Sequence, residues 1–171
     1  MIYIKYLKYV LMHKWYVFLA CKKMGITWLG IVHDLDKFYP SEFFPYARYF
    51  KGKISAGRSG TGYYKPYDTG SEEFDFAWFL HQKRNKHHWQ WWVMPKDGEG
   101  VKLLEMPEKY IKEMVADWIG ASKAQKSTGT PADWYKENGH KLQLHRTTRI
   151  NVELLLQHLY PTEWGDYRGK I

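Results

Sequence analysis

The hydrophobic positions near the N-terminus of the chain repeat with the spacing of a helix. Apolar side chains recur every three or four residues from residue 2 to residue 23, and the lysines of this stretch lie mostly on another face. Gly25 supplies a stop for this helix, and Thr27 is suited to cap a second helix over 28–38 that closes before Pro40. Because the link is short, we expect the two helices to form a hairpin.

The pattern in the middle of the chain predicts two further helices. The first covers 42–50 and is expected to be interrupted near Pro45, since proline is tolerated only in a first turn. The second covers 74–94, although its end, from Trp89 onward, is rich in residues that favour strands and is open to an extended interpretation. A turn is expected at 95–100, where proline, aspartate and glycines gather.

The C-terminal half alternates amphipathic stretches with helix-ending residues. Pro107 precedes a strong amphipathic pattern over 108–126, and a short helix over 132–138 stops at Gly139. A last helix is capped by Thr147 or Thr148, runs through Leu159 and ends at Pro161. No repeat or linker divides the sequence, so we expect residues 1–171 to form one all-α domain, a helical bundle.

A glycine-rich segment over 51–73 has no sustained periodicity and is the longest expected loop. Loops of this length inside a compact domain are usually functional or disordered. Its cations Lys51, Lys53, Arg58 and Lys65 would allow it to fold over an anion. A mobile insertion without a role fits the same composition.

Composition and charge narrow the class of protein. A chain of 171 residues with 44% hydrophobic and 18% aromatic residues has enough apolar surface to fold, which excludes a disordered protein. The net charge of +8 predicts a surface that attracts anions such as nucleotides, nucleic acid or anionic lipid. The expected partners are therefore a nucleotide or another phosphorylated small molecule, with nucleic acid as a further possibility.

The cysteine content and the N-terminal lysines bear on location. The single cysteine, Cys21, excludes an intramolecular disulfide and suits a reducing compartment. Cys21 follows a Leu-Ala pair like that of a lipoprotein cleavage site, but Lys5, Lys8, His13 and Lys14 interrupt the apolar run that export or membrane spanning would need. We expect a cytoplasmic protein without a membrane span, in the host cytoplasm if phage-encoded. An amphipathic helix at a membrane surface stays open.

The adjacent pair His33 and Asp34 is the main candidate for chemistry. It ends an apolar helical run, where an imidazole and a carboxylate are costly to desolvate unless a metal ion or a hydrogen-bonding partner takes them up. His13 lies in the middle of the first expected helix, and Asp117 lies inside the apolar stretch of 108–126. The alternative is that His33 and Asp34 only cap a helix end or lie in solvent.

These residues resemble a known signature. His13, His33, Asp34 and Asp117 look like the H…HD…D pattern of the HD-domain superfamily of metal-dependent phosphohydrolases. Residues 33–37, His-Asp-Leu-Asp-Lys, are similar to the HD-x-G-K form of that pattern. The whole chain also resembles an uncharacterised family of small phage and bacterial proteins with the same Asn-x-His-His-Trp and Met-Val-Ala-Asp-Trp stretches, which implies no activity.

The HD-domain resemblance implies a helical bundle of HD-domain type that holds a divalent metal ion, with Mn, Fe, Zn, Ni, Co and Mg all open. It implies as ligands His13, His33, Asp34 and Asp117. It also implies that Lys37 contacts substrate phosphate. The sequence departs from the pattern in two places, because Asp36 stands where glycine is common and the gap from His13 to His33 is short. If His13 is instead a core histidine, the site loses one ligand.

A second group of polar residues follows later in the chain. His81, Asn85, His88 and Trp92 are spaced by four, three and four residues, so on a helix they form one stripe. The stripe could supply a second metal site or orient a phosphate, and His81 and His88 could act as general acids. A hydrogen-bonded helix face with His87 pointing outward is the alternative.

The function expected from these residues is that of a metal-dependent phosphohydrolase acting on a nucleotide or related phosphate ester. The metal ion would activate water, Lys37 and Arg84 would neutralise phosphate oxygens, and Asp36 or Glu113 would act as a base or hold a ligand in place. Lys83, Arg84 and Lys86 form a basic cluster that is either a solvated face or a help in holding a polyanion.

Two other functions compete with this one. A nucleic-acid-binding module without catalysis would use the basic and aromatic residues of 86–92 to stack single strands. A helical protein that keeps the ligands but serves as a small-molecule sink or as a structural protein is the other. A carboxylate at Asp117 inside an apolar helix favours the enzyme, because a binder has no need to bury it.

Overall fold

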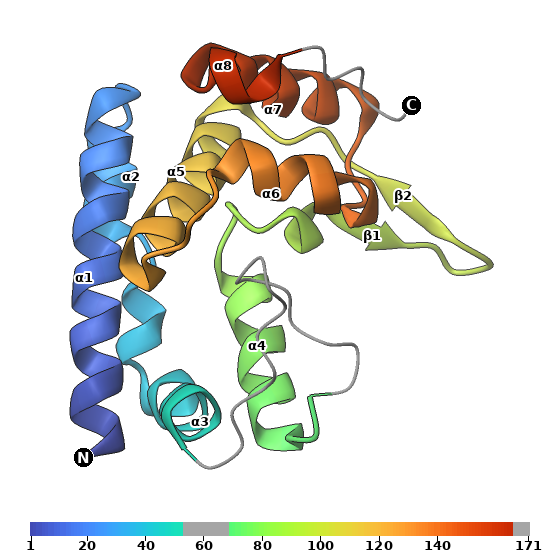
Figure 1. Ribbon diagram of the computed structural model, residues 1–171. Helices are drawn as coiled ribbons and strands as arrows, with labels where there is room; N and C mark the ends of the chain where they lie inside the picture. The colour runs from blue at the N-terminus through green and yellow to red at the C-terminus, as the bar shows by residue number, and fades with distance from the viewer. Residues whose placement is uncertain (53–68, 166–171) are drawn as a thin grey trace.

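The computed structural model of the chain describes residues 1–52 and 69–165 and is mostly helical, which confirms the all-α class (Figure 1). In chain order the elements are α1 (Ile2–Lys23), α2 (Thr27–Val32), the 3-10 helix η1 (Leu35–Phe38), α3 (Pro40–Lys51), α4 (Glu72–Arg84), the 3-10 helix η2 (Trp89–Trp92), β1 (Val93–Pro95), β2 (Val101–Leu103), α5 (Glu108–Gln125), α6 (Pro131–Asn138), the 3-10 helix η3 (Gly139–Lys141), α7 (Arg146–Leu159) and α8 (Pro161–Trp164). Most of the glycine-rich segment expected to fold over an anion lies outside the described residues.

The first two helices form the expected hairpin. Gly25 adopts a left-handed conformation with φ of 75°, and the Ile26 amide donates to the Cys21 carbonyl at 3.0 Å, which closes the end of α1. Gly30 lets α2 approach α1, because a Cβ atom there would lie 2.7 Å from the Cβ of Cys21. The expectation that Thr27 caps α2 is wrong, since Thr27 lies inside the helix and Ile26 precedes it.

The expected second helix over 28–38 is broken in the middle. Helix α2 ends at Val32, and the chain resumes as the short η1 after Asp34. Asp34 has φ of 52° and ψ of 32°, a left-handed conformation that cannot continue a right-handed helix. The break turns the Asp34 side chain into the interior, where it is 1% exposed.

Helices α1 and α5 pack closely along their length. Gly120 of α5 faces α1, where an added Cβ would lie 3.1 Å from the amide nitrogen of Val17 and 3.2 Å from the carbonyl oxygen of His13. This close approach is possible because glycine has no side chain. It brings the middle of α1 beside Asp117, one turn before Gly120 on α5.

Helices α3 and α4 pack beside α1 around an aromatic cluster. The rings of Tyr49 and Phe74 stack with centroids 3.8 Å apart, and Tyr6 of α1 joins the same buried cluster. The expected interruption of the third helix is wrong: α3 runs through Pro45, which is buried within it. Proline has no N–H, so α3 lacks the hydrogen bond that a residue at position 45 would donate to the preceding turn.

The expected helix over 74–94 is wrong in its second half. Helix α4 ends at Arg84, where the side-chain amide of Asn85 donates to the His81 carbonyl at 2.9 Å and satisfies the helix end. The chain then forms η2 and a hairpin in which β1 pairs antiparallel with β2, Val93 opposite Leu103. The expected turn after residue 95 closes this hairpin.

The C-terminal helices complete the bundle and enclose a second buried apolar cluster with α5. Thr130 and Asp133 form a reciprocal capping box at the start of α6. The expected threonine cap of the last long helix is wrong, because α7 begins at Arg146 and the His145 side chain accepts a hydrogen bond from the Thr147 amide. Across the described ranges, none of the helices combines the length and the apolar character needed to cross a bilayer.

Candidate metal centre

Four residues from three separate parts of the sequence meet in the interior between α1 and α5. His13 Nε2 lies 3.0 Å from Asp117 Oδ1 and 3.7 Å from Asp34 Oδ2. His33 Nε2 lies 3.5 Å from the same Asp117 oxygen and 3.3 Å from the same Asp34 oxygen. All four side chains are buried. The residues singled out by the resemblance therefore form one cluster, with each side chain offering one donor atom within 4.8 Å of the others.

Asp34 also faces a second group of histidines. Its other oxygen, Oδ1, lies 3.5 Å from His81 Nε2 and 3.4 Å from His87 Nε2. His88 completes this set, again with donor atoms within 4.8 Å of one another. We call the cluster of His13, His33, Asp34 and Asp117 the first donor set, and that of Asp34, His81, His87 and His88 the second donor set. The two sets share one carboxylate.

The backbone of Asp34 explains how one residue serves both sets. A left-handed conformation is rarely adopted by a residue with a side chain, and aspartate tolerates it better than most. Strained backbone of this kind concentrates at functional sites. At Asp34 it interrupts the chain between α2 and η1 and holds the carboxylate between the histidines of α1 and α4.

Further carboxylates contact the Nδ1 atoms of the histidines, on the side of each ring opposite Asp34. Glu113 Oε1 lies 3.1 Å from His33 Nδ1 and 3.4 Å from His87 Nδ1. On the other side, His81 Nδ1 lies 2.9 Å from Asp36 Oδ2 and 3.0 Å from Glu42 Oε2. A carboxylate that accepts from Nδ1 fixes the tautomer in which Nε2 keeps its lone pair. These three histidines are thus arranged as nitrogen donors aimed at Asp34.

Two cations balance the acidic side of the cluster. Lys37 Nζ lies 2.6 Å from Asp34 Oδ2, and both side chains are nearly buried. Arg84 pairs with Glu42, the carboxylate that supports His81. Because Glu42 already pairs with the Arg84 guanidinium, the expected contact of Arg84 with phosphate stays a prediction. Lys37 lies directly at the carboxylate that the two donor sets share.

The charges of the cluster depend on its burial and on its pairs. Burial raises the pKa of Asp34, but His33 and Lys37 outweigh it and hold that pKa well below its usual range. Burial likewise lowers the pKa of His33, but the charge of Asp34 and hydrogen bonds to Asp117, Asp34 and Glu113 together outweigh it, so the His33 pKa is well above its ordinary value. The pKa of His88 is lowered well below that of a free imidazole by burial and by its histidine neighbours. His88 is therefore a neutral nitrogen donor.

The unpaired polar atoms of the cluster are better explained by a metal site than by a metal-free protein core. Five histidines have a buried Nε2 atom that makes no hydrogen bond within the described part of the chain. They are His13, His33, His81, His87 and His88. A buried polar atom without a partner costs about 1–3 kcal/mol. Imidazole nitrogens and carboxylate oxygens together are the donors that first-row divalent ions prefer. A bound cation would satisfy these atoms at once.

The sequence-based expectations for the site meet the structure with mixed results. The proposed stripe of His81, Asn85, His88 and Trp92 is wrong, because α4 ends at Arg84 and the other three residues do not continue this helix. His81 and His88 nevertheless meet in the second donor set, and Asn85 donates to Asp36 Oδ2 at 2.6 Å. Trp92 instead donates to the Lys86 carbonyl.

Two residues of the site were not singled out by the sequence. His87, which points outward in the alternative interpretation of the stripe, is 2% exposed and belongs to the second donor set. Glu42 comes from α3 and reaches His81 across the bundle. The adjacent histidines 87 and 88 were the available signal for His87, but a helical interpretation placed only one of them inward. Asp36 and Glu113 lie behind the histidines, as expected of residues that hold ligands in place.

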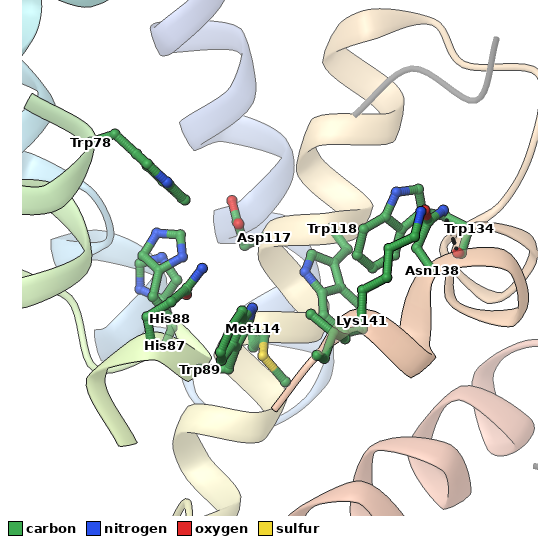
Figure 2. Close-up of a pocket in the computed structure, with 12 residues that line it drawn as sticks. Trp78, His87, His88, Trp89, Met114, Asp117, Trp118, Trp134, Asn138 and Lys141 are labelled. Carbon is green, nitrogen blue, oxygen red and sulfur yellow. Dashed lines mark hydrogen bonds between the residues drawn. The ribbon is translucent and has the colours of Figure 1, made fainter. Parts of the chain in front are cut away.

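A cavity of about 240 Å³ lies next to the two donor sets (Figure 2). Asp117, His87 and His88 line it at the centre, so the two donor sets border an open space. Four tryptophans also line it, namely Trp78, Trp89, Trp118 and Trp134, together with Gln90, Met114 and Leu142. Lys141 and Asn138 lie with Trp134 at the end away from the histidines (Figure 2).

Comparison with known proteins identifies the family of this chain but indicates no activity. Residues 3–158 match a family of unknown function, DUF5662. No curated protein and no solved structure matches the chain. The interpretation of the site therefore depends on its own geometry.

Proposed function

We propose that this chain, which belongs to the DUF5662 family of unknown function, is a metal-dependent phosphohydrolase that acts on a nucleotide or related phosphate ester. One observation supports this most directly. The two oxygens of the buried Asp34 carboxylate face two donor sets, with Oδ2 toward His13 and His33 and Oδ1 toward His81 and His87. A carboxylate shared in this way is suited to two cations, the arrangement used to clamp the attacking and leaving oxygens of a phosphoryl group.

The donor atoms indicate which ions the centre would take. The first donor set would offer two imidazoles and two carboxylates, and the second would offer three imidazoles and the shared Asp34. Mixed nitrogen and oxygen donors suit Mn, Fe, Co, Ni and Zn, whereas Mg prefers oxygen donors and several waters. When bound, such an ion supplies a Lewis acid for the phosphoryl oxygens and lowers the pKa of water.

The remaining residues have separate tasks in this proposal. Lys37, at the shared carboxylate, would neutralise a non-bridging phosphate oxygen without entering the donor sets. Asp36, Glu42 and Glu113 would hold the histidines in one tautomer and orientation, so they are positioning residues. Burial of the cluster would exclude bulk water and strengthen each of these electrostatic interactions.

Single-strand binding is the competing function, and the contacts of residues 86–92 give it little support. The Trp92 indole donates to the Lys86 carbonyl at 2.8 Å, and the Lys86 ammonium lies 5.7 Å from the centroid of the Trp91 ring. The edge of the Trp92 ring and one face of the Trp91 ring thus have partners within the chain. If binding is nevertheless the function, oligonucleotide affinity should fall steeply with salt and with Trp91→Ala.

Metal content and turnover test the proposal together. Protein purified without chelator should contain Mn, Fe, Co, Ni or Zn by elemental analysis and should release phosphate from members of a nucleotide panel. Asp34→Ala and Asp117→Ala should lose both the metal and the activity, whereas Asp97→Asn, an exposed turn residue, should keep both. A wild type without metal, or turnover that survives both substitutions, would overturn the proposal.

A further inference from the structure

We infer that the tryptophan-lined cavity beside the metal centre binds the base of a nucleoside monophosphate, with the phosphate directed at Asp117 and the histidines. The inference rests on the proposed function for the phosphate end of the ligand. The other end is assigned by the cavity itself: its size, its aromatic walls and the polar atoms that its walls leave without a partner.

The cavity has room for one small molecule only. Its volume of about 240 Å³ lies below the range of roughly 300–1,000 Å³ that is typical of drug-sized ligand pockets. It extends from Asp117 and the histidines at one end to Trp134, Asn138 and Lys141 at the other (Figure 2). A ligand that fills it would place one end at the donor sets and the other among the tryptophans. A polynucleotide would not fit within these walls.

The walls are unusually aromatic. The rings of Trp118 and Trp134 lie with centroids 5.2 Å apart, and the Trp78 ring meets His88 edge-on with centroids 5.0 Å apart. Trp89 also lines the cavity, on the side of His87 and His88 (Figure 2). Indole faces bind planar heteroaromatic rings by stacking, and every nucleobase offers such a face. An acyclic phosphate ester would leave most of this surface uncovered.

Two unpaired polar atoms of lining residues favour a ligand with a heteroaromatic ring over one with a hydrocarbon ring. Within the part of the chain that the structure describes, buried Trp134 Nε1 has no acceptor and buried Gln90 Oε1 has no donor. A nucleobase carries ring acceptors and exocyclic or ring N–H donors that could pair with such atoms, whereas a hydrocarbon ring would leave both unpaired. Sites of this kind discriminate strongly against ligands that lack the matching polar atom.

The far end of the cavity is polar as well as aromatic. Lys141 Nζ donates to Asn138 Oδ1 at 2.8 Å, so a lysine held in place stands beside Trp134. Lys141 and Asn138 thus offer further hydrogen-bonding groups at the end of the cavity that the base would occupy, while the phosphate would lie at the other end, beside Asp117 and the histidines. A nucleoside monophosphate combines the planar base, the hydrogen-bonding edge and the anionic group that these features require.

The test compares ligands that differ only in the base. AMP, GMP, CMP and UMP are titrated against the metal-loaded protein by intrinsic tryptophan fluorescence, with adenosine and ribose 5-phosphate as the two halves of the ligand. We expect AMP and adenosine to quench the fluorescence and ribose 5-phosphate to leave it unchanged. Trp134→Phe, which keeps a ring but removes Nε1–H, should weaken nucleotide binding about tenfold. Trp15→Phe, on the exposed face of α1, should not alter binding.

Kinetics provide the second measurement. Trp134→Phe should raise the KM of the nucleoside monophosphates about tenfold and leave kcat within about twofold, since Trp134 lies at the end of the cavity away from the donor sets (Figure 2). Gln90→Leu provides an independent variant if Trp134→Phe fails to fold, and the same increase in KM is expected of it. Circular dichroism shows which variants are folded.

The two proposals can fail separately. Binding of adenosine without turnover of any phosphate ester would overturn the phosphohydrolase and leave the cavity assignment standing. Turnover of ribose 5-phosphate as fast as of AMP, with no effect of Trp134→Phe or Gln90→Leu on either binding or KM, would overturn the cavity assignment and leave the phosphohydrolase standing.

Discussion

Glu113 Oε1 lies 3.1 Å from His33 Nδ1 in the interior of the protein, and the same oxygen lies 3.4 Å from His87 Nδ1. One carboxylate thus supports a histidine of each donor set. Glu113 also precedes Asp117 by one turn of α5, so both side chains point from the same face of that helix. A single helix therefore supplies one donor of the centre and the group that orients two others.

Glu113→Gln tests this relationship. The amide keeps the shape of the side chain but loses the charge that makes the two imidazoles better donors. We expect metal affinity to fall about 10-fold to 100-fold, the usual effect of losing a group behind a ligand. Competition with a chelating dye measures the change. Glu108→Gln, an exposed residue of the same helix, is the matched control and should leave the affinity unchanged. Equal affinities in both variants would contradict a supporting role for Glu113.

Metal binding should also stabilise the fold, because the donor atoms converge only in the folded chain. A ligand at 100 times its Kd stabilises the native state by about 2.7 kcal/mol. For a chain of this size, 1 kcal/mol raises the Tm by roughly 2–4 °C, so Mn²⁺ or Co²⁺ should raise the Tm of chelator-treated protein by about 5–10 °C. Differential scanning fluorimetry measures the shift.

Asp34→Asn is the control for this stabilisation, because asparagine tolerates the left-handed backbone but is a poor bridging ligand. The Tm of this variant should respond only weakly to the metal. A shift of the same size in the variant and in the wild type would show that the ion binds elsewhere.

Much of the fold could be predicted from local signals. The periodicity of α1 and α5 and the glycine stop at Gly25 are properties of neighbouring residues, and the structure confirms them. His13 and Asp117 stood out as polar residues on apolar helices, which is also a local observation. The structure brings them to 3.0 Å from each other.

The second donor set could be predicted only in part, because the sequence singled out His81 and His88 for a possible second metal site but not His87. Its geometry depends on the end of α4 at Arg84, after which His87 and His88 leave the helical period and both lie at the cluster. At the helix end the backbone amide and the side chain of Asn85 both donate to the His81 carbonyl, a contact that a pattern of hydrophobic residues does not reveal. Glu42 joins from α3 through packing between distant elements. Such contacts follow from tertiary structure and have no local sequence signal.

Gly120→Ala tests whether the close approach of α1 and α5 holds the first donor set together. The added methyl group would meet the backbone of Val17 and His13 and force the two helices apart. Overpacking of this kind costs about 1–3 kcal/mol, measured as the free energy of unfolding in urea, and metal affinity should fall with it. Gly98→Ala, where an added Cβ meets nothing within 4 Å, should change neither quantity. A fully stable Gly120→Ala variant with normal metal affinity would contradict the packing argument.

Cys21 should be chemically silent in the native protein. It is fully buried against Gly30, and burial raises the pKa of its thiol to about 11. Because the thiolate is the reactive form, iodoacetamide at pH 8 should modify native protein far more slowly than protein unfolded in guanidinium chloride, as mass spectrometry would show. Equal rates in the two states would contradict the burial.

The same raised pKa makes part of the stability depend on pH. The folded chain keeps the Cys21 proton between the ordinary thiol pKa of 9.0 and about 11, whereas the unfolded chain loses it in this range. The unfolded state therefore binds fewer protons, so this contribution is complete below pH 9 and declines as the pH rises toward 11. Cys21→Ala separates this effect from other alkaline titrations. The difference in unfolding free energy between the wild type and the variant should shrink across this range, and a difference independent of pH would show that burial does not shift the thiol.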